Sequence, residues 1–430
     1  MPFDIVTYAL LKKVKPVTTA AVSASAVVLP AAEDLSAGDF VNIFDDNGTL
    51  KVRKASASDL HKPAHGYVLD DVTAGNDVTV YFDGLNTKLS GLIPKRYYYL
   101  STTLGKTTDS PYLLFEQRLG MALSDTTMYV KIENLIIKSA IGVFGGGYPG
   151  TNAIDYITIS NLSNAVDFGD LTVARHLLAA TSNGINDRGI FGGGKDSLNV
   201  IDYITISSPN NATDFGDLTR GRHALAATSN GTDDRGVFGG GDDGTGVVNI
   251  IDYITISSPS NATDFGDLTV ARGFFAATSN GTNDRGVFGG GYSSGYENAI
   301  DYITISSPSN ATDFGDLTTA REYLAATSNG TNDRGVFGGG SSGPTYYNTI
   351  DYITISSPSN ATDFGDLTTV RKAPAATSNG TDDRGVFGGG NDKSDYVNSI
   401  DYITISSPGN AADFGDLTVA RGFFAATSNA

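Results

Sequence analysis

Most of the chain is one unit of about fifty residues that occurs six times. Each unit begins at the first glycine of a Gly-(Val/Ile)-Phe-Gly-Gly-Gly run, and these glycines are Gly142, Gly189, Gly236, Gly286, Gly335 and Gly385. The steps between them are 47, 47, 50, 49 and 50 residues. A period of this length, with several strand-like segments in each unit, predicts a β-propeller rather than one large core.

Each unit contains four short segments with strand character. Around the third of these glycines they are Leu225–Ser229, which lies just before Gly236, then Gly236–Gly241, Ile251–Ser257 and a run around Phe265. Ile, Tyr and Thr favour strands, and the Ser-Pro and Asn-Gly sequences between the segments favour turns. Four strands and four turns in one period make one blade of a propeller.

The ends of the repeated region predict that the ring closes on itself. No Ala-Arg…Ala-Ala-Thr-Ser-Asn segment precedes Gly142, whereas one follows the sixth unit at Arg421–Asn429. We therefore expect the C-terminal segment to supply the innermost strand of the first blade, which leaves no free strand edge at the seam. An open array would instead need atypical capping units at its ends, and the sequence contains none.

Residues 142–430 resemble the kelch repeat. The resemblance is carried by a double glycine after an apolar pair, an Asn-x-Ile-Asp-Tyr strand about ten residues later, and an Arg before the next unit. Kelch units usually carry a Trp in the outermost strand, and this chain has no Trp. A phenylalanine stands near that place in every unit: Phe168, Phe215, Phe265, Phe314, Phe364 and Phe414. We expect the Arg and the Asp of Ile-Asp-Tyr to form structural ion pairs, as in a kelch-like ring.

The first third of the chain differs from the repeats. Residues 1–32 are interpreted as an anchoring segment and extended arm, and a frayed tail is the alternative for the first fifteen residues. Residues 33–138 contain short strand-like runs between turns, including an Asn47-Gly48 hairpin signal. The predicted fold is therefore all-β, with a small β-barrel or sandwich-like domain at 33–138 before a closed six-bladed kelch-like propeller at 139–430.

Five short runs stand out in residues 33–138: Ala37-Gly-Asp-Phe-Val, Gly66-Tyr-Val, Leu89-Ser-Gly-Leu-Ile-Pro, Tyr98-Tyr-Leu-Ser and Arg118-Leu-Gly-Met-Ala-Leu-Ser. In these runs residues 33–138 resemble small β domains of bacteriophage tail-fibre and other virion proteins. The resemblance implies a virion component that is made in the host bacterial cytoplasm and that attaches to other virion proteins through residues 1–138.

Negative charge is concentrated in the repeats. Residues 1–140 hold 14 Lys and Arg against 15 Asp and Glu, and the remaining residues hold 15 against 32. An acidic ring repels phosphate backbones, so we expect no nucleic-acid partner. The chain has neither an apolar run long enough for a membrane span nor a basic leader followed by an apolar core, so we expect no membrane span and no secretion signal. Asn-x-Thr sequons recur in the repeats and are interpreted as turn residues; examples are Asn211, Asn261, Asn310 and Asn360.

No arrangement of residues predicts catalysis. The absence of Cys excludes cysteine nucleophiles and thiolate metal sites. His176 and His223 share a repeat position that holds Gly, Glu or Lys in other units, which is not typical of a catalytic pair. His61 and His65 flank Pro63, so no helix places them on one face. We predict a protein that is not an enzyme and has no cofactor or metal site; Ca²⁺ is the alternative to solvated turns at residues 242–245 and 391–395.

The six units differ mainly in two stretches, one after the triple glycine and one after the repeated Arg. In a four-stranded antiparallel blade both stretches lie on the same rim. Tyr among Gly, Ser, Asn and Asp is typical of adaptable recognition surfaces, although loops also vary when nothing constrains them. The candidate ligand-binding residues are Tyr148, His176, His223, Phe274, Tyr292, Tyr296, Tyr323, Tyr346, Tyr347, Tyr396 and Phe423.

The sequence thus favours a non-enzymatic phage tail fibre or appendage whose propeller binds a host-surface receptor, in particular a glycan. A homo-oligomer is expected, with a trimer as one option. The alternative is a structural capsid decoration, cement or head-fibre protein with a passive propeller. A third class, an oxidase-like enzyme on a propeller, conflicts with the absence of Cys for a copper-site crosslink.

Overall fold

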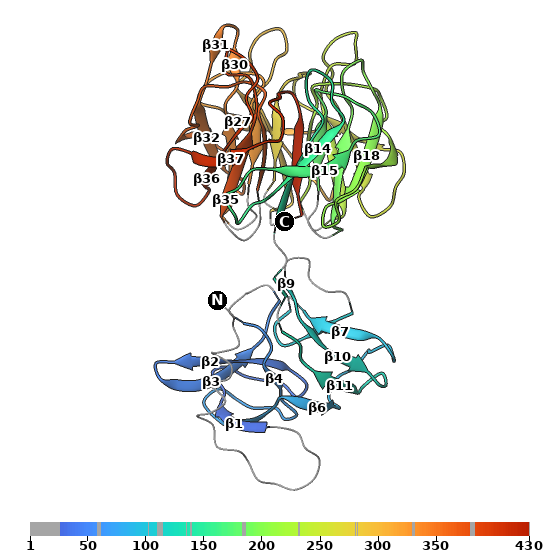
Figure 1. The fold of residues 1–430 in the computed structure, drawn as a ribbon, viewed down its shortest axis with the longest axis vertical. Helices are drawn as coiled ribbons and strands as arrows, with labels where there is room; N and C mark the ends of the chain where they lie inside the picture. Colours follow the sequence, from blue (N-terminus) through green and yellow to red (C-terminus); the bar gives the residue numbers. More distant parts are fainter. Residues whose placement is uncertain are drawn as a thin grey trace. The chain divides into compact units, whose positions relative to one another are not determined.

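The computed structural model describes residues 26–57, 62–101, 103–109, 115–134, 136–137, 140–182, 186–230, 233–279, 281, 283–328, 332–378 and 383–429. Within these ranges the protein is all-β: it contains strands but no helix, and the named strands pair antiparallel. The chain divides into two compact units, Met1–Lys138 and Ser139–Ala430. Both are drawn in Figure 1.

The C-terminal unit contains six four-stranded sheets of one design. In the third sheet the strand order is β20 (Ala226–Thr228), β21 (Arg235–Gly239), β22 (Ile250–Thr255) and β23 (Thr263–Asp267). The second sheet contains β16 (Ala179–Thr181), β17 (Arg188–Gly192), β18 (Val200–Thr205) and β19 (Thr213–Asp217); the fourth, β24 (Ala276–Thr278), β25 (Arg285–Gly289), β26 (Ala299–Thr304) and β27 (Thr312–Asp316); the fifth, β28 (Ala325–Thr327), β29 (Arg334–Gly338), β32 (Thr349–Thr354) and β33 (Thr362–Asp366); and the sixth, β34 (Ala375–Ser378), β35 (Arg384–Gly388), β36 (Ser399–Thr404) and β37 (Ala412–Asp416).

The first sheet combines the two ends of the C-terminal unit. It contains β13 (Ile141–Gly145), β14 (Ala153–Thr158) and β15 (Val166–Asp170), and its fourth strand is β38 (Ala425–Ser428). In the antiparallel pair of β13 and β38, Gly142 lies opposite Ser428 and Gly145 lies opposite Ala425. The prediction that the C-terminal segment supplies a strand to the first sheet is confirmed.

The short strand at one end of each sheet, here called the inner strand, contacts the inner strands of the neighbouring sheets. β38 contacts β16, β16 contacts β20, and the contacts continue from neighbour to neighbour through β24, β28 and β34. The last of these, β34, contacts β38. Apolar cores lie between neighbouring sheets: one combines Val237 and Ile251 of the third sheet with Phe288 and Ile303 of the fourth. Gly239 makes room for this packing, since a Cβ there would lie 2.9 Å from the Phe288 ring. Each sheet therefore depends on its neighbours for a buried face.

Six buried ion pairs repeat around the unit, and they confirm the expected pairing of the repeated Arg with the Asp of Ile-Asp-Tyr. In five of them the Nη2–Oδ2 distance is 2.9–3.1 Å. The Arg272 guanidinium also donates to the carbonyls of Phe288 and Ala299, and Thr269 Oγ1 donates to Asp301 over 2.6 Å. The pairs are Arg175–Asp202, Arg222–Asp252, Arg272–Asp301, Arg321–Asp351, Arg371–Asp401 and Arg421–Asp155.

Polar side chains also connect each sheet to the next. Arg235 lies over the Tyr253 ring, 5.0 Å from its centroid, and donates a 2.7 Å hydrogen bond to the Ile305 carbonyl of the neighbouring sheet. The Asn310 side chain accepts a 3.1 Å hydrogen bond from the Asp267 backbone N–H. Asn211, Asn261 and Asn360 accept the equivalent hydrogen bond from the preceding sheet. These side chains therefore have a structural role between sheets.

The N-terminal unit is built from two five-stranded sheets and one strand pair. The first sheet has the order β1 (Ala26–Pro30), β5 (Asp77–Tyr81), β4 (Gly66–Tyr67), β2 (Phe40–Asp46) and β3 (Thr49–Lys54). The second has the order β6 (Asp83–Asn86), β11 (Met128–Lys131), β10 (Arg118–Ala122), β7 (Tyr97–Leu100) and β8 (Thr107–Thr108), and the separate pair is β12 (Ile136–Ile137) with β9 (Phe115–Glu116).

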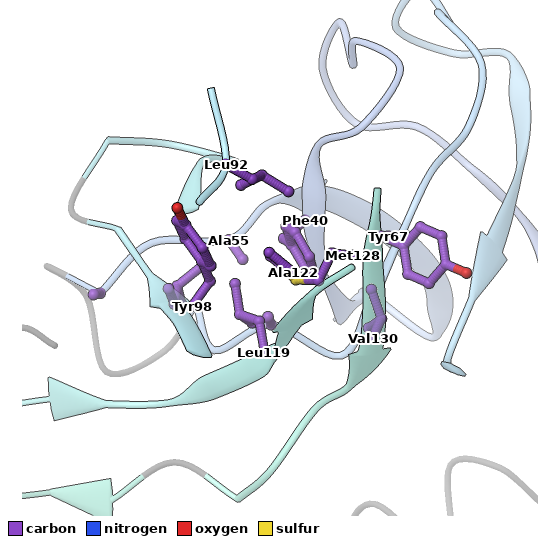
Figure 2. Close-up of a cluster of buried hydrophobic side chains, with 12 residues drawn as sticks. Phe40, Ala55, Tyr67, Leu92, Tyr98, Leu119, Ala122, Met128 and Val130 are labelled. Atoms are coloured by element: carbon purple, nitrogen blue, oxygen red, sulfur yellow. The ribbon is translucent and has the colours of Figure 1, made fainter. Parts of the chain in front are cut away.

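One apolar cluster joins the two five-stranded sheets. Phe40 and Tyr67 come from the first sheet, and Leu119, Met128 and Val130 come from the second (Figure 2). The hairpin predicted from Asn-Gly is confirmed, since β2 and β3 pair on either side of these two residues, both of which have positive φ.

The predicted arm overlaps with the first sheet of the N-terminal unit. β1 pairs along its whole length with β5 and lies before residue 33, where the predicted β domain begins. The earlier part of the predicted arm, residues 1–25, lies outside the described residues.

Candidate ligand-binding site

In each sheet, the variable stretch after the triple glycine lies next to the variable stretch that follows the Arg of the preceding unit. Isolated β-bridges join them in five sheets, and in the remaining sheet the Lys195 N–H donates to the His176 carbonyl over 2.8 Å. The bridges are Tyr148–Gly422, His223–Asp242, Gly273–Tyr292, Glu322–Ser341 and Lys372–Asn391. The stretches that distinguish the units are thus brought together in every sheet.

A ring of six backbone hydrogen bonds runs through the second variable stretch. The residue two positions after each repeated Arg donates its N–H to the carbonyl of the equivalent residue in the neighbouring sheet. The donors and acceptors are Ala224 to Leu177, Phe274 to Ala224, Tyr323 to Phe274, Ala373 to Tyr323, Phe423 to Ala373 and Leu177 to Phe423, over 2.7–3.1 Å. Leu177 accepts the first of these bonds and donates the last, so the six bonds form a closed circle. We call these six residues the axial ring.

All six axial-ring residues have the left-handed backbone conformation, with φ between +54° and +62°. None of them is glycine, and this conformation costs a non-glycine residue about 1–2 kcal/mol. Such strain persists only where the surroundings impose it, and it is common at ligand sites. The ring hydrogen bonds impose it here, because they hold every backbone in the same place whatever the side chain.

Seven aromatic side chains form a continuous chain of ring contacts, here called the aromatic arc. The centroid distances along it are 5.4 Å for His176–Tyr148, 5.2 Å for Tyr148–Tyr396, 6.3 Å for Tyr396–Phe423, 5.3 Å for Phe423–Tyr323, 4.7 Å for Tyr323–Phe274 and 6.4 Å for Phe274–His223. Every sheet contributes at least one of these side chains. The ends, His176 and His223, belong to the neighbouring second and third sheets, and no ring contact joins them within the described residues.

The axial ring surrounds a cavity of about 80 Å³, which is lined by the ring residues and the residue that follows each of them. The two smallest ring residues, Ala224 and Ala373, stand three sheets apart and therefore on opposite sides. Next to Ala373 the larger Tyr323 and Phe423 reach each other, so their rings enclose that side. Four ring residues, among them Tyr323, remain partly exposed to solvent, as the walls of an open site must be.

Two lysines lie against the tyrosines of the fifth sheet. Lys372 Nζ is 5.3 Å from the Tyr323 centroid and 5.0 Å from the Tyr346 centroid, and Lys393 Nζ is 5.4 Å from the Tyr346 centroid. Burial raises the pKa of Glu322, and the Lys372 ammonium opposes this rise. The lysines bring positive charge to one sector of an otherwise acidic unit.

The imidazoles at the two ends of the arc are uncharged at neutral pH. Burial lowers the pKa of both His176 and His223, and the Lys195 ammonium lowers it further; Asp196 acts in the opposite direction on both, and Asp242 on His223. The ordinary histidine pKa is about 6.5, so both rings are neutral at pH 7. His223 is 8% exposed, and its buried Nδ1 has no hydrogen-bond partner among the described residues.

The arc contains seven of the eleven sequence-predicted residues, and the other four lie beside it or apart from it. Tyr346 is connected to the arc through Lys372. Tyr347 bonds Ser342 at the hairpin of β30 (Ser341–Ser342) and β31 (Thr345–Tyr346). Tyr292 and Tyr296 contact each other, with centroids 5.6 Å apart.

Three axial-ring residues, Leu177, Ala224 and Ala373, were not among the predicted site residues. Sequence reasoning selected residues by aromatic character. The signal that would have found them is positional, since each lies two residues after the repeated Arg.

The described residues contain no group of three or more His, Asp or Glu side chains that could hold a metal ion. His61 lies outside the described residues, and His65 Nδ1 accepts a hydrogen bond from the Ile43 N–H. No helix in the described part of the chain is long and apolar enough to cross a membrane. No protein-family model matches the chain, and no curated protein matches it either.

Proposed function

We propose that the C-terminal unit is a closed six-bladed, kelch-like propeller and that the aromatic arc binds a ligand without converting it chemically. The closed fold is supported by the pairing of β38 with β13, by the inner-strand contacts that return to β38, and by the axial ring. The observation that carries the binding function is the arc, because aromatic side chains from all six sheets form one chain of ring contacts. Three of them, Phe274, Tyr323 and Phe423, line the cavity.

A saccharide is the ligand class that this surface favours. Aromatic rings offer flat apolar faces that stack on the C–H faces of sugars, and a few polar groups beside them fix orientation. Tyr396, Lys372 and the two arc imidazoles supply such groups. The proposed ligand is therefore a glycan on the surface of a host cell.

The proposed setting is a phage virion, with this protein as a tail fibre or appendage made in the host bacterial cytoplasm. In this proposal residues 1–138 attach the protein to other virion proteins and to further copies of itself. The charge distribution supports this arrangement, because residues 1–140 are nearly neutral and allow close approach, whereas the repeats are strongly acidic.

The test is adsorption of the full-length protein to bacterial cells and to a panel of their surface polysaccharides. The double variant Tyr323→Ala with Phe423→Ala removes the centre of the arc, and we expect it to lower binding at least tenfold. The matched control is Tyr129→Ala, which removes a half-exposed tyrosine from the other unit and should leave binding unchanged.

Equal adsorption of the arc variant and the wild-type protein would contradict the proposal. It would instead favour a passive role as a capsid decoration, cement or head-fibre protein. Thermal melting of each variant checks that a loss of adsorption does not come from unfolding.

A further inference from the structure

The cavity at the axial ring admits only a small part of a ligand. Its volume is only about 80 Å³. A typical small-molecule pocket has about 300–1,000 Å³. A whole pyranose ring therefore stays outside on the arc, and only a substituent of a few non-hydrogen atoms enters.

The walls of the cavity favour an uncharged, largely apolar substituent. The side chains that line it are aliphatic or aromatic. The ring N–H groups are all used as donors in the ring itself, so the backbone offers no free donor to an incoming oxygen. A carboxylate or phosphate would lose its hydration without compensation, and a hydroxyl group would lack a partner. A methyl group loses nothing polar and gains contact with the walls.

The aromatic arc determines the side from which the substituent enters. Tyr323 and Phe423 enclose the side near Ala373, whereas the arc is interrupted near Ala224, between His176 and His223. His223 directly precedes Ala224, and its buried Nδ1 has no partner among the described residues. A neutral imidazole nitrogen without a hydrogen can accept a hydrogen bond from an amide N–H. The His223 ring also contacts the ring of Phe274, which lines the cavity, so this acceptor lies next to the residues that form the apolar interior.

We infer that the cavity receives the acetyl group of an N-acetylated amino sugar, with its methyl group inside the axial ring and its amide N–H directed to His223. This inference rests on the proposed saccharide binding by the arc and adds the sugar class. Tyr323 and Phe423 provide the aromatic surface on which the pyranose ring lies, and Ala224 provides the space that the acetyl methyl group fills. The acetyl oxygen stays outside the axial ring, in water.

The first experiment compares pairs of sugars that differ only at the acylated position. The full-length protein is titrated by ligand-observed NMR with the methyl glycosides of the N-acetylated gluco-, galacto- and manno-hexosamines and of the three parent hexoses. We expect at least one N-acetylated sugar to bind at least tenfold more tightly than its parent hexose. An N-butanoyl analogue of that sugar should bind more weakly than the N-acetyl form, because the cavity has no room for two more carbons.

Two axial-ring variants test the cavity directly. Ala224→Leu fills the cavity. Leucine can adopt the backbone conformation of Ala224, since Leu177 already has this conformation at the equivalent position, with φ of 58°. We expect this variant to lose the preference for the acetylated sugar. Leu177→Ala enlarges the cavity and should bring N-butanoyl binding to within about threefold of N-acetyl binding. Thermal melting establishes that both variants are folded.

The outcomes separate this inference from the proposed function. Binding of hexoses and N-acetylated sugars with equal affinity, or an acetyl preference that survives Ala224→Leu, would overturn the inference and leave saccharide binding intact. A lack of binding to every sugar by a protein that also fails to adsorb to cells would overturn both.

Discussion

The repeated arginine before each inner strand and the axial-ring residue two positions later follow opposite rules. The arginine is identical in six units, wholly buried and paired with an aspartate. The axial-ring residue is Leu, Ala, Phe, Tyr, Ala or Phe, although its backbone hydrogen bond and its φ angle hardly change around the ring. The buried ion pairs, here called the framework, depend on the identity of their side chains. The axial ring depends on backbone hydrogen bonds, so its side chains can differ.

The largest expected effect comes from breaking one framework pair. Arg272→Met leaves Asp301 buried without its partner, and we expect it to lower the free energy of unfolding by about 3–5 kcal/mol. Urea denaturation of the full-length protein measures this loss. Arg96→Met is the matched control: both members of its ion pair with Asp109 are exposed, and removal of such a surface pair costs about 0–1 kcal/mol. If both variants lost the same free energy of unfolding, the buried ion pairs would be no more important for stability than a surface pair.

A smaller effect, of opposite sign, is expected in the axial ring. Ala373→Gly relieves a left-handed conformation that costs alanine about 1–2 kcal/mol, and the greater freedom of glycine in the unfolded chain offsets about 0.5–1 kcal/mol of this gain. The variant should therefore be slightly more stable, with a higher melting temperature. Ala376→Gly in β34 is the control, since an ordinary strand position is expected to lose stability. If both glycines lower the melting temperature alike, the ring is not strained.

The smallest effect concerns pH and again separates the site from the framework. Burial lowers the folded-state pKa of His223 below its unfolded value, so the unfolded chain binds more protons at acidic pH. The stability that neutral His223 provides is therefore present above about pH 6.5 and is lost as the pH falls below it. We expect the difference in melting temperature between pH 7.5 and pH 5 to be smaller in His223→Gln than in the wild-type protein. His65, whose pKa is also lowered by burial, remains in both proteins and contributes equally. His176 also remains, and the part of its pKa lowering that comes from His223 is lost together with that residue. An unchanged difference would show that His223 is not protonated on unfolding.

The sequence predicts best those parts of the fold that depend on residues repeated in every unit. The strand periodicity around Ile251, the ion pair of Arg272 with Asp301, and the strand at Ala425 each depend on residues that recur in every unit. The two-sheet arrangement of the N-terminal unit follows less clearly, and β1 lies in what the sequence assigns to an arm.

The axial ring could not be predicted from local sequence. Leu, Phe and Tyr rarely adopt positive φ, so nothing near Tyr323 indicates its conformation; the hydrogen bond from the neighbouring sheet imposes it. The contact of Tyr323 with Phe423 depends on the small side chain of Ala373 between them, and the two residues stand 100 positions apart in the chain. The aromatic residues were visible in the sequence, but their order along the arc was not.

A closed circle of backbone hydrogen bonds that accepts both small and large side chains has a consequence for how such a protein evolves. Recombination between near-identical repeats can exchange one unit for another without disturbing the neighbouring units. Each exchange presents a new combination of large and small groups to the outside in a single genetic step. For the proposed binding function, this means that new specificities arise by rearranging existing units rather than by slow point substitution.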